Sequence, residues 1–247
     1  MKNTRWRRIV LSVLMILFLT GNSVLGNDIG SVRAAKKPGR VKKIAIDAGH
    51  QARGDSSTEP MGPGSSTRKA KVAGGATGVS TRTPEYKLTL KVARRLRREL
   101  MSRGYEVVMI RTSNNVNISN KKRAQMANKS GADICIRIHA DGSSSSSVRG
   151  ASVLYPSARN PYVGKLSKPS KRLSDCLIRN YCKATGIRNR GLSQRDDLTG
   201  TNWSTIPVSL IELGFLSNPT EDRMMQKAGV QKKMAKGIAD GVDAYFR

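Results

Sequence analysis

Both histidines of this 247-residue chain directly follow a run of mostly apolar residues. His50 comes after KIAIDAG, and His139 comes after ICIRI. A lone histidine at the end of a strand is usually structural, but two in the same kind of position can bind a metal ion together. Catalytic zinc typically takes three protein ligands and leaves a fourth position for water, and two histidines with one glutamate form a known set. The pattern therefore predicts one zinc ion per chain, with a carboxylate as the third ligand.

Four carboxylates near the expected ends of strands or helices are candidates for that third ligand: Asp47, Glu85, Asp141 and Glu212. Glu85 lies in the first turn of an expected helix, from which its side chain can reach back toward His50. A glutamate in the first helical turn also interacts favourably with the helix dipole, and it needs no metal for that. The residues alone leave both roles of Glu85 open.

Glu212 lies inside the apolar run SLIELGF, where an ionised carboxylate is costly unless it is paired or functional. Burial raises the pKa of a carboxyl group toward the working pH. Such a group can take a proton from water that a metal has activated and pass it to a leaving amine. A salt bridge with one of the many arginines is the alternative that the sequence leaves open.

Strand and helix patterns alternate along the chain, and these elements must position the candidate residues. Runs typical of strands cover residues 41–48, 105–112, 132–140, 150–157 and 205–214. Helical patterns cover residues 84–103, 120–131, 166–185 and two segments after residue 218. This alternation predicts an α/β fold, a single domain with a mostly parallel or mixed central sheet flanked by helices. Because ligands of open sheets bind beyond the carboxyl ends of the strands, the zinc site is expected at that edge.

Local signals support the helix boundaries. Thr83 is a suitable N-cap and Pro84 a suitable first residue for the helix that begins there. Asn218 and Pro219 are suited to the same two roles in a later helix. In the first helix, apolar residues recur every four positions and predict one buried stripe: Leu88, Val92, Leu96 and Leu100.

Two long segments are predicted to be loops. Residues 51–83 are rich in glycine, serine, threonine and proline and show no period of 2 or 3.6 residues. Residues 189–204, which read NRGLSQRDDLTGTNWS, form the second predicted loop. Loops of such length in compact domains are usually functional or mobile.

The composition fits one folded domain with a large excess of positive charge. Hydrophobic residues make up 38% and charged residues 25% of the chain, which allows an ordinary core. The formal net charge is +28, and a field of this size attracts polyanions. Aromatic residues make up only 4%, so stacking platforms for bases are few and nucleic acid is disfavoured as a partner. Three cysteines without a CxxC pair argue against a thiolate metal site.

The N-terminal segment has the pattern of a secretory signal. Four basic residues precede an apolar run over residues 9–20, and small residues follow up to Gly26. The apolar run is short for a membrane span, although an uncleaved anchor is the alternative. We predict a signal peptide over residues 1–26, a basic linker over 27–42 and a folded domain over 43–247. The protein is therefore expected to be secreted and to act at the extracellular cell wall, either free or anchored.

Five ordered segments carry a resemblance to a known family: IAIDAGH, the glutamate of PEYKLTL, ICIRIHADG, NRGL and SLIELGFLSN. Over residues 43–246 the chain resembles the zinc-dependent N-acetylmuramoyl-L-alanine amidases. The resemblance implies zinc bound by His50, Glu85 and His139 at one edge of the sheet, and Glu212 as the catalytic carboxylate. It also implies hydrolysis of the amide that joins the lactyl group of N-acetylmuramic acid to L-alanine of the peptidoglycan stem peptide.

Two features depart from the usual pattern of that family. The bridge between His50 and Glu85 is long, and we expect it to lie on the substrate side of the site. Arg137 stands where a small residue often precedes the second histidine, and on a strand its side chain faces the same way as that of His139. Arg137 is a candidate to bind a stem-peptide carboxylate, or else to pair with a nearby acid. Arg190, in NRGL, is a candidate for binding substrate or organising the site.

Other functions compete with this prediction. A zinc peptidase acting on stem peptides would use similar residues, although the sequence has no HExxH helix. A basic envelope-binding module without catalysis would not need the complete set of two histidines and two glutamates. We therefore predict a monomeric peptidoglycan hydrolase whose basic surface also binds anionic wall polymers.

Overall fold

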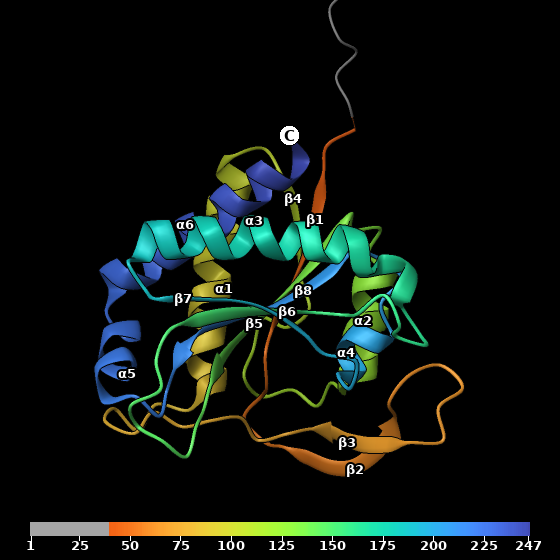
Figure 1. Cartoon of the computed structure of the whole chain (residues 1–247), viewed down its shortest axis with the longest axis horizontal. Helices are drawn as coiled ribbons and strands as arrows, with labels where there is room; N and C mark the ends of the chain where they lie inside the picture. Colours follow the sequence, from red (N-terminus) through yellow and green to blue (C-terminus); the bar gives the residue numbers. More distant parts are fainter. Residues whose placement is uncertain (1–39) are drawn as a thin grey trace, which may run out of the picture. The chain divides into compact units, whose positions relative to one another are not determined.

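A six-stranded sheet forms the centre of the computed structural model, which describes residues 40–247 (Figure 1). The strands lie in the order β4-β1-β5-β8-β6-β7, and β2 and β3 form a separate two-stranded sheet. The predicted signal peptide and most of the predicted linker fall outside the described residues. The strand bounds are Lys43–Ala48 (β1), Asp55–Pro60 (β2), Arg68–Val72 (β3), Glu106–Met109 (β4), Ile134–Asp141 (β5), Ala151–Tyr155 (β6), Asn189–Gln194 (β7) and Val208–Phe215 (β8).

The central sheet is mixed, as the sequence predicts. β1 runs parallel to β4 and β5, and β5 runs parallel to β8. β6 runs antiparallel to β8 and parallel to β7. The carboxyl ends of β1, β5 and β8 therefore meet at one edge, where His139 lies directly opposite Glu212 in the β5–β8 pair. The α/β prediction is confirmed.

Helices cover both faces of the central sheet. α1, α3 and α6 enclose the larger core on one face, and α2 packs over a smaller core on the other. Successive side chains of β1 point to opposite faces of the sheet. Ile44 and Ile46 therefore pack in the larger core, and Ala45 packs in the smaller core. The helices span Glu85–Ser102 (α1), Asn120–Lys129 (α2), Ser167–Thr185 (α3), Thr199–Asn202 (α4), Pro219–Met225 (α5) and Ala228–Phe246 (α6), with a 3₁₀ turn at Gly164–Leu166.

The predicted apolar stripe anchors α1 to the core. Its four members, Leu88, Val92, Leu96 and Leu100, have no exposed surface. Burial of each such side chain contributes about 1.5–3 kcal/mol relative to exposure. The stripe therefore fixes α1 firmly against the sheet, with its first residue, Glu85, at the edge where the strands end.

Residues 51–83 contain a β-hairpin, so the prediction of an extended loop was wrong for much of this segment. β2 and β3 lie outside the central sheet and present no face to the main core (Figure 1). Alternation of apolar and polar residues is not required in such a hairpin, and the periodic signal is therefore absent. Contacts with the body hold it in place, since Trp203 Nε1 donates to the Pro60 carbonyl (3.0 Å) and Asn120 Nδ2 to the Lys71 carbonyl (2.9 Å).

The second predicted loop, residues 189–204, was also wrong in part, because it contains β7 and α4. Within residues 40–247, β7 is an edge strand that pairs with β6 alone, and its sequence NRGLSQ carries no apolar alternation. α4 is a single helical turn of four residues, too short for a periodic pattern. The prediction depended on periodic apolar residues, and neither β7 nor α4 contains them.

One of the two predicted helix starts is confirmed, and the other is shifted by one residue. Asn218 caps α5 as predicted, and its side chain accepts from the backbone N–H groups of Thr220 and Glu221. Pro84 is the N-cap of α1 and not its first helical residue. It remains extended because it pairs with Thr77 in an isolated β-bridge.

No helix within residues 40–247 is both long enough and apolar enough to cross a membrane. The three cysteines, all of which lie in this range, form no disulfide. Cys135 is buried in the smaller core.

Candidate metal centre

Two buried arginines hold the loop that follows β1. Arg111 donates from Nε to the Ala48 carbonyl (2.8 Å) and from Nη2 to the Gly49 carbonyl (3.0 Å). Arg123 donates from Nη1 to the Ala48 carbonyl (2.9 Å) and from Nη2 to the His50 carbonyl (3.0 Å). Each arginine is only 2% exposed, so these charge-assisted hydrogen bonds form away from water. They fix the backbone from which the His50 side chain projects.

Asp47 pairs with two buried arginines. One carboxylate oxygen accepts from Arg123 (2.8 Å) and the other from Arg137 Nε (3.0 Å). Burial alone would raise the pKa of Asp47, but the two arginine charges hold it well below its usual range. Arg137 also donates from Nη2 to Asn120 Oδ1 (2.9 Å). Of the two roles that the sequence left open for Arg137, pairing with a nearby acid is therefore observed.

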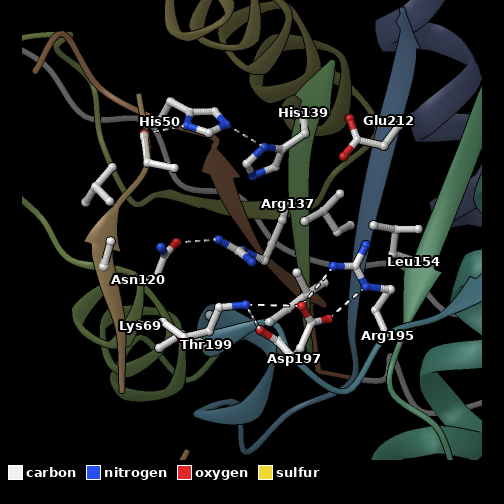
Figure 2. Close-up of a pocket in the computed structure, with 16 residues that line it drawn as sticks. His50, Lys69, Asn120, Arg137, His139, Leu154, Arg195, Asp197, Thr199 and Glu212 are labelled. Atoms are coloured by element: carbon white, nitrogen blue, oxygen red, sulfur yellow. Dashed lines mark hydrogen bonds and ion pairs between the residues drawn. The ribbon is translucent and has the colours of Figure 1, made fainter. Parts of the chain in front are cut away.

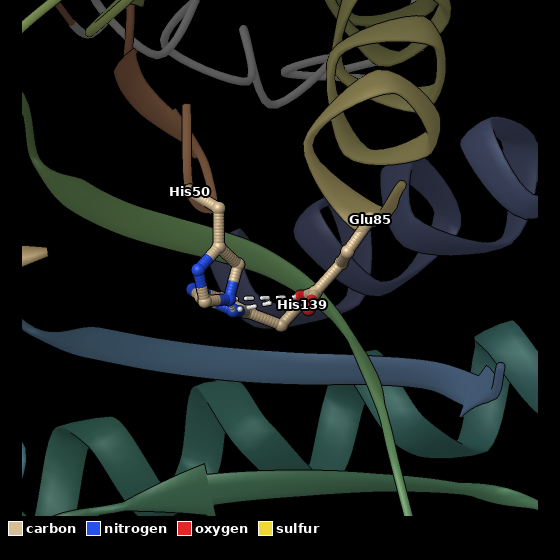
Figure 3. A group of neighbouring side chains, drawn as sticks. All are labelled: His50, Glu85 and His139. Carbon is tan, nitrogen blue, oxygen red and sulfur yellow. Dashed lines mark hydrogen bonds and ion pairs between the residues drawn. The ribbon is translucent and has the colours of Figure 1, made fainter. Parts of the chain in front are cut away.

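The side chains of His50, Glu85 and His139 converge at the end of the sheet (Figure 3). His139 Nδ1 lies 3.1 Å from both His50 Nε2 and Glu85 Oε1, and His50 Nε2 lies 3.2 Å from Glu85 Oε1. Tetrahedral ligands of zinc at about 2.0–2.1 Å from the ion are about 3.3 Å from one another. The three atoms thus have nearly the spacing of three corners of a zinc tetrahedron.

Hydrogen bonds orient two of these three side chains for metal binding. His50 Nδ1 donates to the Ala73 carbonyl (2.8 Å), which leaves the lone pair of Nε2 facing the other two residues. Glu85 accepts from the backbone N–H of Ala140 at Oε1 (3.0 Å) and of Ala76 at Oε2 (2.9 Å). Two nitrogen atoms and a carboxylate oxygen at this spacing suit a shared cation, so the residues present fit a zinc ion.

Close packing around these side chains requires two glycines. A Cβ at Gly49 would overlap with the imidazole of His139, and a Cβ at Gly75 would lie 2.8 Å from the ring of His50. Gly75 also has a φ of +80°, which favours glycine. His50 has a φ of +59°, which few residues other than glycine adopt and which recurs at functional sites.

The three side chains also differ in how readily they take up protons. Burial lowers the pKa of His139 to about 4. Burial opposes protonation of His50 as well, but the hydrogen bond and charge of Glu85 outweigh it and raise the pKa of His50. The two neighbouring histidines hold the pKa of Glu85 well below its usual range, although burial acts the other way. Near neutral pH Glu85 is therefore ionised and His139 is a neutral imidazole, which are the forms that bind metal ions.

Glu212 lies next to the triad, on β8 and opposite His139. Its Oε2 atom is enclosed and has no hydrogen-bond partner among residues 40–247. Burial raises the pKa of Glu212 well above its usual value, and the negative charges of Glu85 and Asp141 raise it further. The arginine salt bridge that the sequence left open is not formed within the described part of the chain. A carboxyl group in such surroundings is a candidate for proton transfer.

A cavity of about 310 Å³ opens beside the triad, and Figure 2 shows the side chains that line it. The two histidines and Glu212 lie at one end, and Arg137 lies in the middle. The other end carries Lys69 from β3 together with Arg195 and Asp197 from the loop after β7. The hairpin thus forms one wall of the cavity.

Sequence reasoning missed several residues that shape this site. Lys69, Arg195 and Asp197 lie in segments predicted to be loops, where no pattern indicates which side chains face inward. Arg111 and Arg123 were also missed. The position of Arg111 directly after the apolar run VVMI was a usable signal, because a charge beside a core strand needs buried partners.

Arg190 lies apart from the triad and outside the lining of the cavity. Its guanidinium group lies 5.4 Å from the centre of the Phe215 ring, and Nη1 donates to the Arg149 carbonyl at 3.4 Å. The structure does not bring Arg190 together with the other candidate residues. Its role in binding substrate or organising the site stays a prediction.

Comparisons with known proteins find relatives over nearly all of the described chain. Residues 44–244 match the model of the family described as N-acetylmuramoyl-L-alanine amidase. An N-acetylmuramoyl-L-alanine amidase of Mycobacterium tuberculosis is 30% identical over 213 residues, which cover 82% of this chain and 86% of the relative. A germination-specific N-acetylmuramoyl-L-alanine amidase of Bacillus subtilis is 29% identical, with 99% of this chain and 96% of the relative covered.

Solved structures show the same similarity. The apo form of the amidase Ami1 from Mycobacterium abscessus superimposes with a TM-score of 0.76 at 27% identity, covering 83% of this chain and 99% of the other. Ami1 from Mycobacterium smegmatis gives a TM-score of 0.75 at 26% identity, covering 83% and 96%. The fold and the sequence thus point to the same group of proteins.

Proposed function

The chain belongs to the N-acetylmuramoyl-L-alanine amidase family of enzymes, and we propose that it uses zinc to cleave the amide between N-acetylmuramic acid and L-alanine in peptidoglycan. The family match over residues 44–244 and the amidase relatives support the bond that is cut. The single observation that carries the mechanism is the triangle of ligand atoms from His50, Glu85 and His139. Beside it lies Glu212, whose Oε2 atom has no hydrogen-bond partner among residues 40–247.

His50, Glu85 and His139 would hold the zinc ion, which when bound supplies a Lewis acid that polarises the scissile carbonyl. The Ala73 carbonyl keeps the proton of His50 on Nδ1, so Nε2 stays available as a ligand. Two backbone N–H groups hold the carboxylate of Glu85 in one orientation. These contacts fix the ligand atoms before the substrate arrives.

Glu212 would move the proton during hydrolysis. Its carboxylate takes a proton from the attacking water and delivers it to the nitrogen of the departing L-alanine. No hydrogen bond from residues 40–247 competes for Oε2, so this atom is free to do so. A divalent cation at the triad would oppose the rise in the pKa of Glu212, because a nearby positive charge favours the ionised carboxylate.

Arg137 and Arg190 remain candidates for contact with substrate. Arg137 lines the cavity, and its ion pair with Asp47 fixes the direction of its guanidinium group. We propose that it contacts the stem peptide in the middle of the cavity. For Arg190, which is exposed, we propose a contact with substrate outside the cavity.

A digestion of purified peptidoglycan tests the proposed function. We expect new amino termini on L-alanine and no new reducing sugar ends. We expect a chelator to abolish cleavage and added zinc to restore it. New amino termini on another residue would identify a peptidase, and reducing ends would identify a glycosidase. Either result would overturn the proposal. If the protein adsorbs to the wall but cuts no bond, it is the envelope-binding module that the sequence left open.

We also propose that the protein acts in the extracellular cell wall as a monomer. Residues 1–26 would direct secretion or anchor the chain, residues 27–42 would link, and residues 43–247 would form the catalytic domain. The signal pattern of the N-terminal sequence supports this assignment. Sequencing the N-terminus of the exported protein would test it, because it shows whether residues 1–26 have been removed.

A basic band on α1 and α6 supports an anionic wall polymer as a second partner. Two adjoining hollows share Arg98 and together are lined by seven cationic side chains but only one carboxylate, Glu99. Glu99 already pairs with Arg103. Aromatic side chains are absent from both linings, so the band offers charge and not base stacking. The cationic members are Arg94, Arg95, Arg97, Arg98, Lys232, Lys233 and Lys236.

Charge reversal tests the basic band directly. We expect the double variant K232E/K233E to adsorb to isolated walls at least about tenfold more weakly, since each lost cation near an anionic surface costs roughly 1 kcal/mol. Adsorption of the unaltered protein should fall steeply with salt. K168E/K171E on α3 is the matched control, because both lysines are exposed and the change in net charge is the same. Equal losses in the two variants would show that only net charge matters.

A further inference from the structure

The cavity beside the triad has two chemically different ends. Near the triad it holds the ligand histidines and Glu212, and part of its lining is apolar, with Leu154 and Leu210. The far end is built by Lys69, Arg195 and Asp197, which we call the Arg195 subsite (Figure 2). Nothing in the proposed mechanism uses this end.

Arg195 is held in a fixed orientation by Asp197. Its Nε donates to Oδ1 (2.7 Å) and its Nη2 to Oδ2 (2.9 Å). Such a bidentate pair fixes the plane of the guanidinium group. The third nitrogen, Nη1, points toward Glu212 in Figure 2, and no residue in the described range accepts a hydrogen bond from it. An aligned donor is therefore directed along the cavity toward the catalytic end.

The Arg195 subsite has a surplus of positive charge. Lys69 donates to the backbone oxygen of Asp197 (2.7 Å) and pairs with its carboxylate (3.1 Å), so two cations share one anion. Arg137, the other cation of the cavity, pairs with Asp47, which Arg123 also contacts. The subsite itself therefore carries one more positive than negative charge. Its side chains are 39–47% exposed, so solvent screens the charge until an occupant displaces water.

We propose that the Arg195 subsite binds the free carboxylate of the residue that follows L-alanine in the stem peptide. The inference rests on the proposed function, because it places the cut amide between the triad and Glu212. On the sugar side of that amide, N-acetylmuramic acid offers no free charge, since its lactyl carboxyl is part of the amide. An anionic ligand in the cavity must therefore come from the peptide side. L-alanine then lies against the apolar lining, and the next carboxylate accepts from Arg195 Nη1.

Two substrates that differ in one group test this inference. N-acetylmuramoyl-L-alanyl-γ-D-glutamyl-L-lysine carries the free α-carboxylate on its second residue, and its counterpart carries an α-carboxamide there. With the zinc-loaded full chain, we expect kcat/KM to be about tenfold higher for the carboxylate substrate, as one charge-assisted hydrogen bond provides. In R195M this preference should shrink to nearly one, mainly through loss of the carboxylate substrate. R179M on α3 is the control, because Arg179 also forms a single exposed ion pair.

Two results would overturn the Arg195 subsite. One is an equal loss on both substrates in R195M, which indicates a structural role. The other is the absence of any preference in the unaltered enzyme. If neither substrate is cut, the proposed function fails, and binding then tests the subsite separately. Titration of the zinc-loaded protein with L-alanyl-γ-D-glutamyl-L-lysine and with its carboxamide should still show tighter binding of the carboxylate, and no difference in R195M. Equal affinities would contradict the inference.

Discussion

Replacement of Glu212 by glutamine is expected to lower hydrolysis of peptidoglycan by about 10³-fold, the usual contribution of a positioned general acid–base group. The amide of glutamine has nearly the same shape but cannot accept a proton from water or deliver one to the leaving amine. Oε2 of Glu212 makes no hydrogen bond to any residue from 40 to 247, so the substitution breaks no contact there. The fold and the metal site should therefore survive.

Three measurements on E212Q separate catalysis from structure. Release of L-alanine amino termini gives the rate, metal analysis after dialysis gives the zinc content, and thermal unfolding gives the stability. We expect a full complement of zinc and an unfolding temperature at least as high as that of the unaltered protein, since burial of an ionisable group is relieved. E106Q, at an exposed glutamate of β4 that pairs with Lys43, should retain full activity. Activity within tenfold of normal in E212Q would remove Glu212 from the mechanism.

Replacement of Glu85 by glutamine is expected to weaken zinc binding by more than about 100-fold, because even outer partners of metal ligands contribute 10–100-fold. Glutamine lacks the negative charge that offsets the dication. Its amide N–H would also face the backbone N–H of Ala76 or Ala140, which now donate to the carboxylate. Activity should fall in parallel with zinc content and recover in part at high zinc concentration.

A second glutamate on the same helix provides the control for E85Q. Glu99 pairs with Arg103 near the other end of α1, so E99Q removes a carboxylate of the same helix without touching the triad. Competition with a coloured chelator measures zinc affinity in both variants. A second variant, H50Q, keeps Glu85, so the backbone N–H groups of Ala76 and Ala140 keep their acceptor. H50Q therefore tests the metal site even if E85Q does not fold. Unchanged zinc affinity in both E85Q and H50Q would mean that the metal lies elsewhere.

Much of the fold follows from the sequence because its main elements are periodic. The α1 stripe from Leu88 to Leu100 repeats every four residues, and the inner strands β1, β5 and β8 are mostly apolar runs. The convergence of His50, His139 and Glu212 also follows, since parallel strands bring their carboxyl ends to one edge. These features depend on local patterns that a single chain displays.

The remaining features depend on contacts between distant segments and leave no local pattern. Arg111 and Arg123 appear in the sequence as two of 45 basic residues, and only the fold makes them buried partners of the loop after β1. The polar hairpin is held by side chains such as Trp203 and Asn120, which lie far from it in sequence. The orientation of Arg195 depends on Asp197 in the same way. Periodicity cannot reveal such residues, because their positions are set by tertiary contacts.

The arginine-held loop has a consequence for which ions the centre accepts. Arg111 and Arg123 hold the loop of His50, and two backbone N–H groups hold Glu85, so contacts within the protein keep these two ligands in place. A triangle with sides of 3.1–3.2 Å suits ions with bonds of about 2.0–2.1 Å. Calcium prefers six to eight oxygen ligands at about 2.3–2.6 Å, which this rigid triangle cannot provide. We therefore expect the centre to prefer zinc over calcium, and we expect the chain to stay folded when the metal is exchanged.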